Sequence, residues 1–135
     1  MTDVGIQKIT SLQRCVARAR EAHAEAGANF RTNYNLQDAA ILNVVRACDT
    51  AIDLANMVIR SRKLGVPNES RDAFTTLARE GIIAPALSDG LKRMVGFRNL
   101  AVHQYREIDL AIVDAVIRKS LDDLLSFAQI IGAEL

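Results

Sequence analysis

The sequence predicts an all-α protein, an up-and-down bundle of about five helices. Half of the 135 residues are hydrophobic but only 4% are aromatic, so the core must be built mainly from aliphatic side chains, as in helices packed on helices. Seven Gly and two Pro are too few for the turns of a many-stranded β fold or for a low-complexity chain. The length is typical of one domain, and we expect a single unit over residues 1–135.

Apolar residues recur every three or four positions through most of the chain, which is the period of an amphipathic helix. The pattern predicts helices over residues 3–26, 36–64, 71–80, 85–100 and 110–131. Residue types that start or end helices lie at their boundaries: Asp3, Gly27, Asn35, Gly65 and Asp109 as caps or terminators, and Pro85 in a first turn. The segments between them are short and rich in turn-forming residues.

Several classes of protein are disfavoured by composition. No apolar run approaches the roughly 18–20 residues that span a bilayer, and the first residues lack a signal-peptide pattern, so we expect a soluble, cytoplasmic protein. Cys15 and Cys48 are too few for a disulfide framework or a thiolate zinc site, and we expect two buried thiols. A net charge of +1 places any nucleic-acid contact on a local patch. No cofactor or metal is expected.

One short segment, GFRNLAVHQYRE at residues 96–107, concentrates polar side chains at the end of a predicted helix. An imidazole can move a proton to or from a 2′-hydroxyl or a leaving oxygen, and a guanidinium can stabilise charge on a phosphate. Arg98 and His103 could therefore cleave RNA without a metal. Their spacing puts them about 140° apart on an ideal helix, so they can meet only if the helix breaks near Leu100 or if two copies face each other. Alternatively, Arg98 and Asn99 cap a helix end while His103 and Tyr105 pack at the rim of the core.

The run from Arg98 to Tyr105 resembles the R-x-x-x-x-H-x-Y signature of HEPN domains, in their HepT-like toxin branch. The likeness extends over roughly residues 35–127, through NLQDAA, AIDLANM, FxxLAREGII and LKRMVGFRN. The resemblance implies a five-helix bundle that forms a homodimer, with both motifs lining one cleft, and a metal-independent endoribonuclease activity. It also implies a partner, a minimal nucleotidyltransferase antitoxin that silences the toxin by transferring AMP to the motif's tyrosine.

Carried over position by position, the resemblance assigns a role to each motif residue. Arg98 would contact the scissile phosphate, His103 would be the acid or base, Asn99 would support them, and Tyr105 would accept the adenylyl group. Lys92, Arg93 and Arg106 cluster around the motif in sequence and are expected to bind RNA, with a two-fold axis doubling their charge. The substrate is expected to be tRNA or mRNA.

Three other features are expected to serve the fold or the surface. His23 lies among alanines and glutamates, and we expect it to face solvent or the helix end. Arg14, Arg18 and Arg20 form a basic stripe, but Glu21 and Glu25 follow at helical spacing, which predicts a solvated face on which Arg18 is paired. Asp49 and Asp53 are one turn apart without an evident third metal ligand, so we expect helix polarity or a partner contact.

Two other functions compete with the ribonuclease hypothesis. The bundle could be a non-catalytic binding subunit for a nucleotidyltransferase, with the motif serving the interface. It could also be a plain structural dimer, although an apolar bundle would not require the polar cluster at residues 98–106. RNA cleavage by the purified protein in the presence of a chelator separates these hypotheses.

Overall fold

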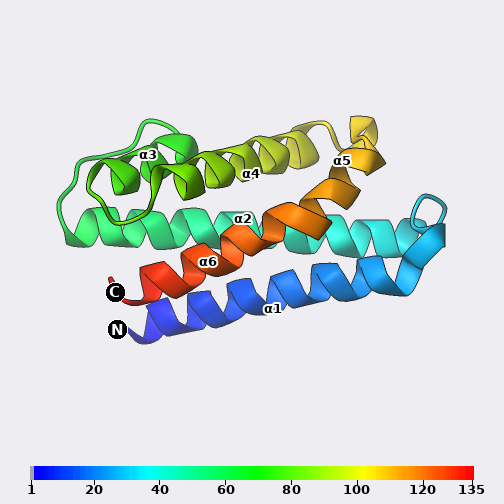
Figure 1. Ribbon diagram of the computed structural model, residues 1–135, viewed down its shortest axis with the longest axis horizontal. Helices are drawn as coiled ribbons and strands as arrows, with labels where there is room; N and C mark the ends of the chain where they lie inside the picture. Colours follow the sequence, from blue (N-terminus) through cyan, green and yellow to red (C-terminus); the bar gives the residue numbers. More distant parts are fainter. Residues whose placement is uncertain (1) are drawn as a thin grey trace.

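The computed structural model describes residues 2–135, and the elements within that range are all helical (Figure 1). The six α-helices are α1 (Asp3–Ala26), α2 (Tyr34–Ser61), α3 (Ser70–Arg79), α4 (Pro85–His103), α5 (Leu110–Ala115) and α6 (Leu121–Gly132). Short 3-10 turns follow α1 and α4, and a π-helical turn, Val116–Ser120, joins α5 to α6. The predicted all-α class is confirmed.

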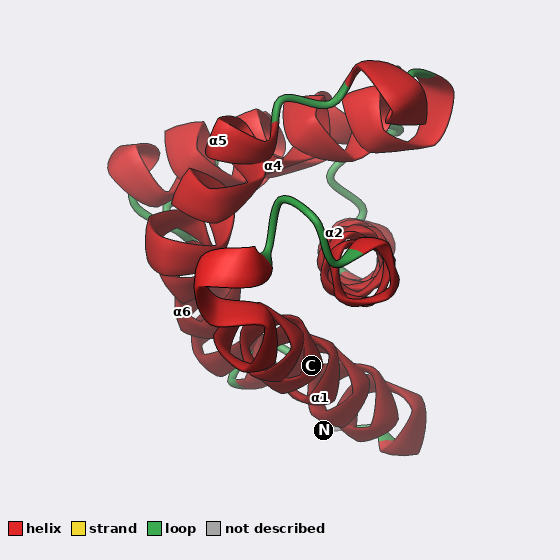
Figure 2. Cartoon of the chain, turned by 90° about the vertical axis from the view of Figure 1, so that its right-hand side faces the viewer, coloured by secondary structure: helices red, strands yellow, loops and turns green. Residues whose placement is uncertain are grey.

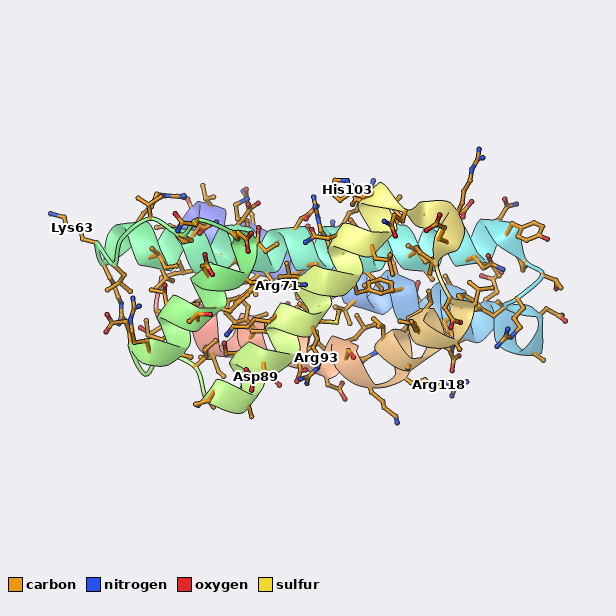
Figure 3. The ribbon with its side chains drawn as sticks, turned by 90° about the horizontal axis from the view of Figure 1, so that it is seen from above. Lys63, Arg71, Asp89, Arg93, His103 and Arg118 are labelled. Carbon is orange, nitrogen blue, oxygen red and sulfur yellow. The ribbon has the colours of Figure 1, made fainter. Side chains whose placement is uncertain are left out.

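The two long helices, α1 and α2, run antiparallel along the length of the molecule (Figure 1). Helices α3 and α4 pack on α2, with α4 antiparallel to it, and α6 crosses the bundle in contact with α1, α2 and α4 (Figures 1 and 2). Helix α4 crosses α2 obliquely, so that its C-terminal half lies over α2 (Figure 3). The two chain ends lie at the same end of the bundle (Figure 1).

The core is made mainly of aliphatic side chains, as the composition predicts. Leu12, Leu54, Leu77, Leu91, Leu121, Leu124 and Ile131 are among its fully buried members. Phe74 of α3 and Phe127 of α6 meet edge to face, with ring centroids 5.4 Å apart. Cys15 and Cys48 are buried free thiols, as predicted.

Several helix boundaries differ from the predicted ones. The N-cap of α1 is Thr2, whose side chain accepts from the Gly5 amide, rather than Asp3. The N-cap of α2 is Asn33, whose side chain accepts from Leu36, and Asn35 lies within the helix. An N-cap side chain accepts from the amide two or three residues further on, and the two asparagines on either side of Tyr34 are both suitable by residue type, which made the register ambiguous.

The ends of the helices depart from the sequence pattern in a similar way. Helix α2 ends at Ser61, before the predicted residue 64. Helix α4 continues to His103 instead of ending at residue 100. The predicted run over 110–131 is divided by the π turn, a local insertion that an apolar repeat does not reveal. Gly27 (φ 52°), Pro85 and Asp109 hold the positions expected of them.

His23 lies in the last turn of α1, as one of its two predicted placements has it, but it does not face solvent. Only 15% of its side chain is exposed, its Nε2 lies 2.6 Å from Asp114 Oδ1, and its ring packs edge-on against Phe30. Asp114 also accepts from Arg118. The hydrogen bonds from Arg118 and His23 lower the pKa of Asp114 below its ordinary value. This cluster ties the end of α1 to α5.

Across residues 2–135, no helix combines the length and the apolar character needed to cross a membrane.

Candidate active site

The polar motif occupies the last two turns of α4 and the 3-10 turn that follows it. Helix α4 is continuous through Leu100 to His103, and it ends at Gln104, whose amide donates to the Leu100 carbonyl at 2.8 Å. Arg98 and His103 therefore keep their separation of about 140° around the helix. Of the two ways in which they could meet, a break near Leu100 within one chain does not occur. The alternative that Arg98 and Asn99 cap a helix end is wrong, because both lie within α4.

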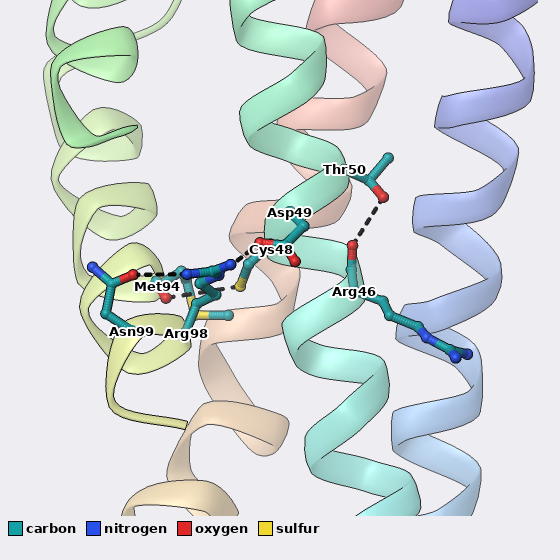
Figure 4. Close-up of polar contacts among 7 residues, drawn as sticks. All are labelled: Arg46, Cys48, Asp49, Thr50, Met94, Arg98 and Asn99. Carbon is teal, nitrogen blue, oxygen red and sulfur yellow. Dashed lines mark hydrogen bonds and ion pairs between the residues drawn. The ribbon is translucent and has the colours of Figure 1, made fainter. Parts of the chain in front are cut away.

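Arg98 is held in place by two acceptors (Figure 4). Its Nε donates to Asp49 Oδ1 of α2 at 2.7 Å, and its Nη1 donates to Asn99 Oδ1 at 3.2 Å. Its side chain is 28% exposed, and Nη2 makes no bond within the described part of the chain. An oriented guanidinium with donors to spare is suited to bind a phosphate, because it can present parallel N–H groups to two oxygens.

The neighbouring Cys48 is not a reactive thiol. It is buried under Arg98 and donates to the Met94 carbonyl (Figure 4). Burial, together with the negative charge of Asp49, raises the pKa of Cys48 to about 12, against an opposing effect of Arg98. The thiol stays protonated at neutral pH and does not act as a nucleophile.

His103 is exposed at the C-terminal end of α4 (Figure 3). Within residues 2–135 it has no hydrogen-bond or ion-pair partner. Both ring nitrogens are available to a substrate.

Tyr105 is held by a second carboxylate of α2. Its hydroxyl donates to Asp38 Oδ1, while its side chain remains partly exposed. Burial raises the pKa of Tyr105 above its ordinary value, and the hydrogen bond to Asp38 and the charge of that carboxylate raise it further. The phenol is therefore protonated at neutral pH. It borders a mostly apolar pocket of about 310 Å³, also lined by Asp38, Ile41, Leu42, Val45, Ala101 and Val102.

The three basic residues predicted to bind RNA are dispersed. Arg106 lies exposed beside Tyr105. Arg93 lies at the side of α4 facing α6, well away from His103 (Figure 3). There its charge partly offsets the effect of burial, which raises the pKa of Asp123. Lys92 is half-buried, and its carbonyl accepts from Arg71.

Sequence reasoning missed the two carboxylates that orient the motif. Asp38 and Asp49 are 11 residues apart on α2, so an ideal helix places them on one face, about 16 Å apart. That spacing is the only local signal, since their partners are 67 and 49 residues away in the chain. Asp49 and Asp53 do not form a metal site: Asp53 pairs with Lys8 instead, and no group of three or more potential metal ligands occurs within residues 2–135.

Comparison with known proteins decides the family. The model of the family described as "Ribonuclease HepT-like" matches residues 12–131. This chain belongs to the HepT-like ribonuclease family. A protein named mRNA nuclease HepT, from Shewanella oneidensis, is 44% identical over 134 residues, which cover 99% of this chain and 100% of that protein.

Solved structures of HepT-like proteins match nearly the whole chain. The tri-AMPylated HEPN toxin of Shewanella oneidensis, in complex with an MNT antitoxin, aligns with a TM-score of 0.93 at 43% identity over 98% of this chain and 99% of that one. A toxin–antitoxin structure with AMP-PNP aligns with the same TM-score at 42% identity, over 98% and 99% of the two chains. The predicted family, helical fold and ribonuclease class are confirmed. The individual roles of the HepT-like motif residues stay predictions.

Proposed function

We propose that this chain is a metal-independent endoribonuclease toxin, in which Arg98 of one copy works beside His103 of a second copy in a homodimer. The observation that carries the proposal is the contrast within α4. Arg98 is fixed by Asp49 and Asn99, while His103, on a different face of the same helix, is exposed. Two copies that face each other can combine the two groups, which one continuous helix holds apart.

In the proposed reaction, the exposed His103 transfers a proton and the oriented Arg98 stabilises negative charge. The 2′-oxygen of the RNA attacks the adjacent phosphorus, and the bond from that phosphorus to the 5′-oxygen breaks. His103 takes the proton from the attacking 2′-hydroxyl or donates one to the leaving 5′-oxygen, with water completing the other transfer, and Arg98 stabilises the charge that develops on the phosphate. An mRNA substrate is favoured over tRNA by the name of the Shewanella oneidensis relative.

We further propose that a minimal nucleotidyltransferase antitoxin silences the toxin by AMPylation of Tyr105. The hydroxyl lies at the surface, two residues after His103, and the relative of known structure is tri-AMPylated in complex with an MNT antitoxin. Each AMP adds a phosphate charge and a base beside the position where the RNA phosphate would bind. Repulsion and occlusion then act together.

The decisive experiment measures RNA cleavage by the purified chain with excess chelator, together with the intact mass. Cleavage by the unmodified wild type, and its loss in His103→Ala with an unchanged thermal unfolding midpoint, are the expected results. If an unmodified, folded dimer fails to cut a panel of mRNA and tRNA substrates, the non-catalytic binding subunit becomes the better hypothesis.

A further inference from the structure

A groove between α1 and α2 lies next to the proposed active site and is not used by it. About 370 Å³ in volume, it is lined by Ser11, Arg14, Cys15, Arg18, Arg46, Asp49 and Thr50. We call it the α1–α2 groove. Asp49 belongs both to this groove and to the ion pair with Arg98, so this one side chain borders the groove and contacts the motif.

Three exposed arginines converge on the groove from two helices. Arg14 and Arg18 are one turn apart on α1, and Arg46 reaches from α2 toward α1, on the side of α2 away from Arg98 (Figure 4). The predicted pairing of Arg18 with Glu21 or Glu25 is wrong: over residues 2–135 none of the three arginines forms an ion pair. The stripe's third member, Arg20, instead pairs across the bundle with Asp122 at 2.7 Å.

The groove is therefore a local site of positive charge on a chain of nearly neutral net charge. Its only carboxylate, among the described residues that line it, is Asp49, and that group is already bonded to Arg98. Ser11 and Thr50 add hydroxyl groups to the lining. Guanidinium groups can bind phosphates through two parallel N–H donors, which makes arginine the residue of choice for such contacts.

We propose that the α1–α2 groove binds phosphate groups of the RNA strand as it leaves the cleavage centre at Arg98. The inference rests on the proposed ribonuclease function, since it assigns the groove to the same substrate. Neighbouring packed helices are about 8–10 Å apart, so a short single-stranded segment can reach from Arg98 across α2 to the groove. The three arginines, rather than Lys92 and Arg93, then form the main electrostatic footprint.

RNA is favoured over an acidic protein surface by the composition of the lining. The lining residues are three arginines, two hydroxyl side chains, the paired carboxylate of Asp49 and one small buried thiol, Cys15. Protein interfaces use arginine as well, but around a core of aromatic or large aliphatic side chains, and none of these lines the groove. A phosphodiester chain needs only the charges and donors that are present.

The test uses the full chain with His103→Ala, a substitution that is expected to abolish cleavage and to leave RNA binding intact. Anisotropy of a fluorescent single-stranded RNA is followed over a series of salt concentrations for this chain and for a version that also carries Arg14→Gln, Arg18→Gln and Arg46→Gln. Loss of three phosphate contacts should reduce the slope of log K against log salt by about 2 and weaken binding at least about tenfold at low salt. A matched control, Arg31→Gln with Arg60→Gln and Arg79→Gln, removes the same charge from exposed positions elsewhere.

Each outcome distinguishes the inference from the function on which it rests. Binding and salt slope that match the control variant would overturn the inference, even if the wild type cuts RNA. If the three arginine substitutions abolished binding of the chain to the antitoxin but left RNA binding unchanged, the inference would also be wrong. The groove would then be assigned to the protein partner. If the wild type fails to cut any RNA, the proposed function fails by its own assay. In a chain that retains His103, the three substitutions should raise KM for RNA and leave kcat nearly unchanged. This is expected when the lost contacts bind the substrate and the transition state equally well.

Discussion

The two ends of the motif are held by the same helix through the same chemical group, with opposite consequences. At one end, the carboxylate of Asp49 meets a guanidinium and forms an ion pair with Arg98. At the other, the carboxylate of Asp38 accepts from a phenol and adds to the effect of burial in raising the pKa of Tyr105. One carboxylate thus orients a guanidinium that is charged in any case, and the other holds a phenol and disfavours its ionisation. His103, between them, has no such partner within the described residues and is left to the substrate.

The comparison explains how one short segment can carry two chemistries. Arg98 is proposed to receive an anion, which requires its guanidinium to be held in position. Tyr105 is proposed to be modified on its hydroxyl, which donates to Asp38. Both side chains are positioned by α2, whose two carboxylates lie three turns apart on one face. One partner of each pair can be changed separately, at Arg98, Asp49 or Asp38. Asp114 is a carboxylate outside the motif and serves for comparison.

The largest effect is expected from removing the guanidinium itself. Arg98→Ala should lower kcat for RNA cleavage roughly 10²–10³-fold, the usual cost of losing a donor that stabilises charge in the transition state. Arg98→Lys should recover part of the rate, because it restores the charge without the paired donors. Single-turnover cleavage measures both. Cleavage by Arg98→Ala within a few-fold of wild type would remove Arg98 from the mechanism.

A smaller loss is expected from removing the partner of that guanidinium. Asp49→Asn should lower kcat about fivefold, since a partly exposed ion pair contributes up to about 1 kcal/mol to fixing its members. Asp49→Glu should recover much of the rate. Asp53→Asn is the control, because Asp53 lies one turn further along α2 and pairs with Lys8. Equal rates for Asp49→Asn and the control would show that Arg98 needs no positioning.

A change of Asp38, at the other end of the motif, should alter the titration of Tyr105 and not the chemistry of RNA cleavage. Asp38→Asn removes the negative charge beside Tyr105 but leaves the burial, so the pKa of Tyr105 should fall toward the ordinary tyrosine value while remaining above it. Tyrosinate absorbance followed against pH, with a Tyr105→Phe version of each chain subtracted, isolates this group. An unchanged titration would mean that the hydrogen bond to Asp38 is not formed in solution.

The smallest effect concerns a carboxylate outside the motif. Hydrogen bonds from Arg118 and His23 lower the pKa of Asp114 in the folded chain, so its contribution to stability is present above the pKa of an unfolded aspartate, about 3.9. It is lost as the pH falls through the lower, folded value. Asp114→Asn should therefore be less stable than wild type in urea unfolding at pH 7, with the two converging in strong acid. A difference in stability that does not change as the pH falls through the acid range would have another cause.

Much of the fold follows from the sequence because it depends on local patterns. Apolar spacing locates α1 to α4 within a few residues and the combined span of α5 and α6, and the residue types at Gly27, Pro85 and Asp109 mark true boundaries. The π turn escapes the pattern, since one extra residue in a turn barely disturbs a repeat of three and four. Asn33 and Asn35 are equally good caps by type, and only the packing of the preceding loop selects between them.

The site is predicted less completely, because its side chains are oriented by residues far away in the chain. Nothing near His23 indicates that Asp114, 91 residues later, will bind it. Arg18 and Glu21 look like a natural pair along one helix, yet the ion pair of α1 nearest to them reaches from Arg20 to Asp122 of α6. The motif itself is visible in the sequence, but its supports on α2 become visible only once α4 is packed against that helix.

The central claim is that one cleavage centre takes Arg98 from one chain and His103 from another, and subunit mixing tests it most directly. Arg98→Ala and His103→Ala chains, each inactive alone, are unfolded together and refolded, and heterodimers are verified by native mass spectrometry. In a two-fold dimer each heterodimer has one intact centre, so the mixture should regain roughly a quarter of the wild-type activity. Verified heterodimers that remain inactive would contradict the account.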